Sequence, residues 1–166
     1  SRAASRSRFR PSPRLIQFSG HGNAVTSGVN AGALAFELED GTLDTPAPDE
    51  FIALLRKCPR LEGVFLNGCM TLRLPKGVQS LGEHIHEVLP HLTVIGWETI
   101  SEDKAATCFA KGFYDALATQ YHNGRLQQRV SLAIAYKRAE GAFLREGFRK
   151  GDPEPLQFAP RAIVMA

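Results

Sequence analysis

The sequence predicts an α/β fold with a mainly parallel central sheet flanked by helices. Three short apolar runs break at glycine, as strands buried on both faces of a parallel sheet do. They are LIQFSGHG at 15–22, VFLNGC at 64–69 and LTVIGW at 92–97. Helix-patterned segments separate the strands, and strand, helix, strand is the order of a right-handed crossover. A chain of 166 residues, of which 43% are hydrophobic, has room for one domain with one core.

The segment between the first two runs predicts a loop, a hairpin and a helix. Residues 22–32 contain Gly and Asn and are expected to form a loop. Residues 33–38 then alternate and meet a turn at Asp40-Gly41, which predicts a hairpin beside the rim of the sheet. Pro48 opens a helix of about nine residues. Its apolar positions are Phe51, Ile52, Leu54 and Leu55.

Beyond residue 69 the pattern predicts three more helices and two more strands. A loop at 70–77 leads to a helix at 78–89, and the strand at 92–96 ends at Trp97. Ser101 is the expected N-cap of a helix at 102–119, where Glu102 and Asp103 complement the helix dipole. A long amphipathic helix is expected at 125–148, followed by a proline-rich turn and a last strand at 162–165. The inward positions expected in these helices are Leu81, Ile85, Val88 and Leu89, then Ala105, Cys108, Phe109, Phe113 and Ala116, and finally Leu126, Val130, Ala133, Ile134 and Phe143.

Reactive side chains follow the first two runs, where the strands should end. His21 follows the first and Cys69 the second. Functional groups of open α/β sheets gather outside the carboxyl ends of the strands, so the two should face one crevice. The thiolate is the attacking form of cysteine, and a neighbouring imidazole can take up its proton and later protonate a departing amine. The pair therefore predicts a Cys/His catalytic dyad.

Four ordered motifs carry a resemblance to a known family. FSGHG, VFLNGC, VIGW and SEDKAATCFAKGFYDAL resemble the CHAT domain, a branch of the caspase-like cysteine peptidases related to separases and metacaspases; the resemblance covers residues 14–120. It implies a caspase-like three-layer sandwich and a cysteine endopeptidase that acts on protein substrates and is activated by a partner or a fused module. It also implies that His21 and Cys69 form the dyad, with the backbone amides of Gly22 and Cys69 as the oxyanion hole.

The resembled family has two further strands before the histidine strand, and these are missing here. We therefore expect residues 14–166 to be the C-terminal part of a longer domain, and residues 1–13, rich in Arg and Ser, to be a basic flexible tail or linker. Without the missing strands the histidine strand would be an exposed edge. Either residues absent from this chain or a partner chain would cover it.

Three further residues have both a functional and a structural interpretation. Trp97, at the carboxyl end of a strand, could floor a substrate pocket or pack in the core. Asp103 could bind a basic P1 side chain or brace a rim loop, and it could equally be an ordinary charge in the first turn of a helix. Asn67 could brace the Cys69 loop by hydrogen bonding, although Asn before Gly is also ordinary turn chemistry.

Composition narrows the partners and the chemistry. Five of the 20 Lys and Arg residues fall within the first 14 positions, which leaves 15 basic against 17 acidic residues in the remainder. The remainder is therefore slightly acidic and lacks the excess of basic residues that nucleic-acid binding requires. The three cysteines form no CxxC pair, so neither a zinc site nor a disulfide framework is predicted, and no cofactor is indicated.

The cysteine usage favours a reducing, intracellular compartment such as the cytoplasm, although the Arg/Ser-rich start also fits an organelle transit peptide. No stretch approaches the ~20 apolar residues of a membrane span, so no membrane partner is expected. Two alternatives to a peptidase stay open. One is a catalytically silent interaction domain that uses the same crevice or edge, and the other is an acyl-thioester enzyme, for which the sequence carries no mark of an acyl-donor pocket.

Overall fold

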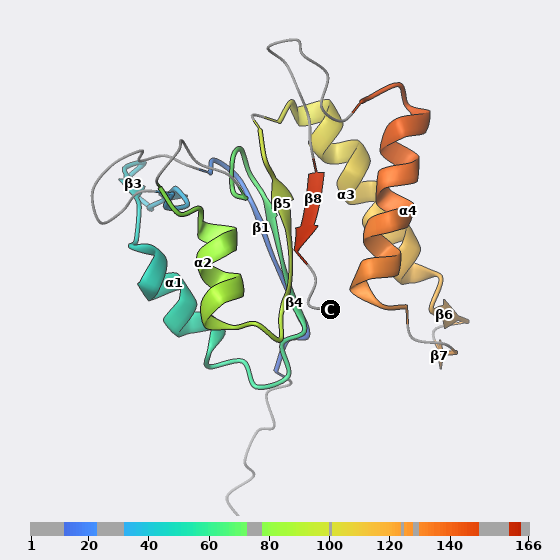
Figure 1. The fold of residues 1–166 in the computed structure, drawn as a ribbon, viewed down its shortest axis with the longest axis horizontal. Coiled ribbons are helices and arrows are strands. Elements are labelled where there is room, and N and C mark those ends of the chain that lie inside the picture. The colour runs from blue at the N-terminus through green and yellow to red at the C-terminus, as the bar shows by residue number, and fades with distance from the viewer. Residues whose placement is uncertain are drawn as a thin grey trace, which may run out of the picture.

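The central sheet has four strands in the order β1-β4-β5-β8 (Figure 1). The computed structural model describes residues 12–22, 32–72, 78–99, 101–123, 125–127 and 130–149, and the backbone of 160–163. Strands β1 (Leu15–Ser19), β4 (Gly63–Asn67) and β5 (Thr93–Trp97) are parallel, and β8 (Pro160–Ile163) runs antiparallel to β5. The expected α/β fold with parallel strands is thus confirmed. Within the described residues β1 pairs with β4 alone, so it is an edge strand.

Two pairs of helices cover the two faces of the sheet (Figure 1). Helices α1 (Pro48–Leu55) and α2 (Leu81–Val88) lie on one face, and α3 (Asp103–Ala118) and α4 (Leu132–Arg145) on the other. Alternate residues of β4 point to opposite faces: Val64 and Leu66 pack with α1 and α2, whereas Phe65 packs with α3 and α4. Both faces are therefore apolar, which explains the continuous hydrophobic runs in the sequence.

The core on the α3 and α4 side is built from aromatic rings. Phe109 of α3 lies at its centre, with ring centroids 5.9 Å from Phe65, 5.7 Å from Trp97 and 6.4 Å from Phe143. Their planes meet at steep angles, the edge-to-face arrangement that aromatic rings favour. This cluster fixes α3, and with it the loop that precedes α3, against the sheet.

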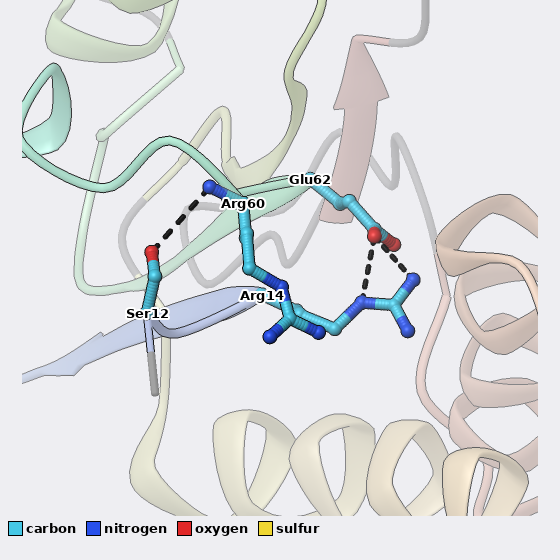
Figure 2. Close-up of polar contacts among 4 residues, drawn as sticks. All are labelled: Ser12, Arg14, Arg60 and Glu62. Carbon is cyan, nitrogen blue, oxygen red and sulfur yellow. Dashed lines mark hydrogen bonds and ion pairs between the residues drawn. The ribbon is translucent and has the colours of Figure 1, made fainter. Parts of the chain in front are cut away.

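The start of β1 is fastened to the start of β4 (Figure 2). The Arg14 carbonyl accepts backbone hydrogen bonds from Glu62 at 2.8 Å and Gly63 at 3.3 Å. The Arg14 guanidinium also donates to one carboxylate oxygen of Glu62 through Nε, at 2.6 Å, and through Nη2. Two residues before Arg14, Ser12 Oγ accepts a hydrogen bond from the backbone N–H of Arg60 at 3.4 Å. These contacts hold β1 in register with β4 at the end of the sheet opposite to His21.

Two small hairpins flank the main elements. Strands β2 (Phe36–Glu37) and β3 (Leu43–Asp44) pair antiparallel, which confirms the hairpin expected around Asp40-Gly41, although β2 is shorter than the alternating segment 33–38. Strands β6 (Tyr121–His122) and β7 (Arg125–Leu126) form the second hairpin, which was not expected. Asn123 at its turn has a φ of 49°, and Asn-Gly at 123–124 is a sequence signal for such a hairpin.

Three helix boundaries differ from the prediction. Helix α4 begins at Leu132, after Ser131 caps it by accepting the Ile134 N–H, and not at residue 125. Its buried face is Ala135, Tyr136, Ala139 and Phe143. Leu126 and Ile134 are exposed, so the predicted apolar face is wrong at these two positions, whereas Val130 and Phe143 pack against the core as expected. Helix α2 begins three residues later than expected because Ser80 and Glu83 form a capping box there. Helix α3 has Glu102 as its N-cap, so Ser101 was the wrong residue for that role.

Several expectations lie outside the described residues. They are positions 1–11 of the basic tail, most of the loop after Gly22, the loop at 73–77, the prolines Pro153 and Pro155, and the last residues of the expected final strand. Strand β8 begins at Pro160, two residues before that strand was expected. In the part of the chain that the structure describes, no helix combines the length and apolarity that crossing a membrane requires.

Candidate active site

The pairing of β1 with β4 brings His21 and Cys69 to the same edge of the sheet. The last paired residues are Ser19 and Asn67, and His21 and Cys69 each lie two positions beyond them. The Gly20 N–H continues the ladder by donating to the Asn67 carbonyl at 3.3 Å. The two segments therefore remain side by side after the strands end, as the sequence pattern predicted.

The loops that carry His21 and Cys69 are in contact at their backbones. A Cβ atom added to Gly22 would lie 2.5 Å from the Cys69 carbonyl oxygen and 3.3 Å from the Cys69 nitrogen. A Cβ atom added to Gly68 would lie 2.8 Å from the Gly20 carbonyl oxygen and 3.0 Å from the Gly22 nitrogen. No side chain larger than hydrogen fits at either position without movement, so the glycines permit the approach of the two loops.

His21 is exposed, and its backbone is anchored to the segment that precedes β2. The His21 carbonyl accepts a hydrogen bond from the Ala35 N–H at 3.0 Å. Ala35 is buried and directly precedes β2. The β2–β3 hairpin is thereby tied to the histidine loop, consistent with its expected position beside the rim.

Cys69 is partly buried, and its thiol contacts the loop after β5. The Ser101 N–H donates to Cys69 Sγ at 3.4 Å, and the Ser101 carbonyl oxygen and Oγ each lie 3.8 Å from the sulfur. Among the described residues the sulfur's hydrogen-bond partner is Ser101, and no hydrogen bond joins it to His21. Sequence reasoning missed this contact, because it assigned Ser101 to the cap of α3.

The residue after the cysteine adopts an unusual backbone conformation. Met70 has a φ of 53°, in the left-handed region that side chains other than glycine rarely enter. Its N–H donates to the Thr99 carbonyl at 2.9 Å, and the Leu72 N–H donates to the Trp97 carbonyl at 2.9 Å. Hydrogen bonds to the end of β5 thus hold the sharp turn on both sides.

Thr71 is the buried polar side chain that ties the Cys69 loop together. Its hydroxyl oxygen lies 3.1 Å from the carbonyl oxygens of Leu66 and Gly68, to which it can donate, and it accepts the Trp97 N–H at 3.1 Å. Its side chain is only 1% exposed. A threonine two positions after the candidate nucleophile was visible in the sequence, but its burial was not.

Trp97 is a core residue and not the floor of an open pocket. Its side chain is 0% exposed and packs against Phe109 and Phe143, so the expected substrate contact at Trp97 is corrected. The indole Nε1 donates to Asn67 Oδ1 at 2.8 Å. Asn67 therefore braces the end of β4 through hydrogen bonding, but its partner is Trp97 of β5 and not the Cys69 loop.

The structure also places Asp103 and the other two cysteines. Asp103 is exposed in the first turn of α3, two residues after Ser101. Cys108 was expected in the core but is only partly buried, and desolvation, followed by the nearby Glu146 charge, raises the pKa of its thiol. Cys58 is also partly buried, with its sulfur 3.9 Å from the Leu54 carbonyl oxygen. Of the three thiols, Cys69 alone lies at the carboxyl edge of the sheet.

Two backbone N–H groups at this edge have no hydrogen-bond acceptor among the described residues. Among the described residues, neither the Gly22 N–H nor the Cys69 N–H donates a hydrogen bond to another group. Two N–H groups from adjoining loops beside a thiol are the donor set that an oxyanion requires. The chain matches no protein-family model, and no curated protein matches its sequence.

Proposed function

We propose that this chain carries the dyad of a caspase-like cysteine endopeptidase of the CHAT type. The observation that supports it most is the register of β1 with β4, which carries His21 and Cys69 the same distance past the end of the sheet, with Gly22 in contact with the Cys69 backbone. A side chain at Gly22 or Gly68 would force the two loops apart, so we expect both glycines to be required for the reaction.

In the proposed reaction His21 removes the thiol proton of Cys69, and the sulfur attacks the scissile carbonyl carbon. The resulting oxyanion is held by the N–H groups of Gly22 and Cys69. The C–N bond then breaks, and the imidazolium of His21 returns its proton to the departing amine. Water, deprotonated by His21, hydrolyses the acyl-enzyme and restores the thiol.

Ser101 has a positioning role in this proposal. Its N–H already donates to the sulfur at 3.4 Å, and such a donor stabilises negative charge on a thiolate. For attack on the substrate, the sulfur keeps its hydrogen bond from Ser101 and turns its opposite side toward the loop that carries His21. Catalytic contacts in an unliganded enzyme are often loose, and bound substrate brings the imidazole and sulfur together.

The substrate is proposed to be a protein with a basic P1 residue, bound by the exposed carboxylate of Asp103. An activating partner or fused module is also proposed, as is a chain that covers the free edge of β1. Both proposals follow from the resemblance, and the edge position of β1 supports the second.

Active-site labelling tests the proposed function. A peptidyl chloromethyl ketone with Arg at P1 alkylates an activated thiol by displacement of chloride, and mass spectrometry of the digested protein reports which cysteine carries the adduct. We expect the adduct on Cys69 in the wild type and at least about a hundredfold slower labelling in His21→Ala. Cys58 and Cys108 serve as internal controls. Equal labelling of all three cysteines, or labelling of Cys69 that does not depend on His21, refutes the dyad.

A second candidate is a catalytically silent interaction domain. The observation that favours it is that the Cys69 thiol is hydrogen-bonded to Ser101 and not to His21. In that case Cys69→Ala binds the partner as the wild type does, and proteolysis is absent with that partner present. A partner whose binding switches on His21-dependent labelling supports the peptidase instead.

A further inference from the structure

A groove runs between α3 and α4, on the outer side of the molecule from the sheet. Its volume is about 470 Å³. Its floor is made of residues with small side chains, Gly112 and Ala116 from α3 and Gly141 and Ala142 from α4. The helices approach closely here, since a Cβ atom added to Gly112 would lie 2.8 Å from the Cβ of Ala142. A small-residue floor of this kind leaves a shallow apolar channel between two rigid helices.

The rim of the groove carries excess positive charge. Lys137, Arg138 and Arg145 line it, against the single carboxylate of Asp115. That carboxylate is already paired with Lys111, at 2.6 Å. Lys137 lies 3.4 Å from Glu140, whose side chain is only 18% exposed, so this carboxylate offsets the charge of the lysine. The two arginines are therefore the main unneutralised charges of the groove.

The guanidinium groups of Arg138 and Arg145 both lie at the groove. Arg138 Nη1 donates to Thr119 Oγ1 at 2.9 Å, across from α4 to the end of α3. Arg145 Nη1 lies 3.4 Å from the position that a Cβ on Gly141 would occupy, so its guanidinium is folded back over the groove floor. The arginines are seven positions apart on one helix, which places them on the same face about 10 Å apart along the axis.

We propose that this groove binds an acidic peptide segment of a partner protein in an extended conformation. Carboxylates three residues apart in a polyproline II segment lie about 9 Å apart on one side, which matches the spacing of the two arginines. Guanidinium groups form bidentate pairs with carboxylates, and the small residues between them in such a segment fit the apolar floor. The site is separate from the Cys69 edge, and its binding does not depend on thiol chemistry.

The test is a fluorescence-anisotropy titration of the Cys69→Ala protein with a labelled peptide in which Glu recurs every third residue, separated by Ala and Pro. We expect saturable binding that weakens between about 50 mM and about 500 mM salt. Arg138→Glu and Arg145→Glu should each weaken it at least about fivefold. Lys57→Glu, a charge reversal at an exposed lysine just after α1, is the matched control and should leave it unchanged. Using two arginine variants keeps the test informative if one of them fails to fold.

A variant that fills the groove provides an independent test of the proposal. Gly141→Leu should abolish peptide binding by filling the floor, whereas Gly141→Ala should retain it. The proposal is overturned by the absence of saturable binding, by equal binding of a peptide with Gln in place of Glu, or by equal weakening in Lys57→Glu. Tighter binding of a single-stranded oligonucleotide than of the Glu peptide, or self-association of the chain through this face in sedimentation, also overturns it.

Discussion

Replacing Gly22 by alanine tests the close contact on which the candidate active site depends. The added methyl carbon would lie 2.5 Å from the Cys69 carbonyl oxygen and 2.7 Å from Thr71 Cγ2. Non-bonded atoms prefer about 3.5 Å, so the histidine loop must retreat by roughly 1 Å. Thr71 is buried and hydrogen-bonded, which leaves the Cys69 side little freedom to yield. We expect an overpacking cost of about 1–3 kcal/mol in the free energy of unfolding.

The same displacement should affect reactivity more than stability. A 1 Å misplacement of catalytic groups can lower a rate about a hundredfold, so alkylation of Cys69 by the chloromethyl ketone should slow by that order in Gly22→Ala. Gly20→Ala is the matched control, because its Cβ would meet only the end of the Phe18 ring, at 3.0 Å. Stability is measured by urea denaturation and reactivity by the labelling rate. Wild-type values of both in Gly22→Ala would refute the reasoning.

Three further substitutions probe the framework, each measured by urea denaturation. Gly112→Ala should lower the free energy of unfolding by about 1–3 kcal/mol, because its Cβ would lie 2.8 Å from an alanine side chain of α4. Gly141→Ala should be neutral or stabilising by up to about 1 kcal/mol. Equal effects of the two substitutions would contradict the packing of α3 against α4. Thr71→Val removes the acceptor of the buried Trp97 N–H and should destabilise by about 1–3 kcal/mol, and an unchanged midpoint would show that this hydroxyl is dispensable. Phe109→Ala should destabilise by about 3–5 kcal/mol, and a loss below 1 kcal/mol would argue against its central place in the core.

The strands were predictable because their signal is local and strong. A parallel strand buried on both faces is apolar throughout, and β4 and β5 are such strands. Strand β1 lies within its run but is only partly buried, with Gln17 and Ser19 exposed, so the expectation of burial on both faces is wrong for this edge strand. The start of α4 was harder to predict, because the apolar residues of the β6–β7 hairpin and of α4 follow nearly the same spacing. Leu126 of the hairpin and Ile134 of the helix fit that spacing, yet both are exposed. The true start of α4 is set by the N-cap at Ser131, whose side chain accepts the Ile134 N–H.

The residues of the candidate site also differ in how well the sequence predicts them. His21 and Cys69 could be named from the sequence, since each follows a strand that ends in glycine. Trp97 could not be assigned correctly, because the same aromatic at a strand end can face a pocket or the core. Its burial is decided by Phe109 and Phe143, which lie on helices far away in the sequence.

The order of apolar runs and glycines by itself determined the parallel strands and the edge of the sheet at which the chain segments with His21 and Cys69 lie, because the burial of a strand is reflected in its local pattern of apolar residues. Only the tertiary structure decided that Ser101 donates to the sulfur, that Thr71 holds the Cys69 loop, and that two arginines of α4 overlook a groove. These features arise between segments that are distant in sequence, and their geometry depends on how whole helices pack. No local pattern of residues specifies that packing to within the length of a hydrogen bond.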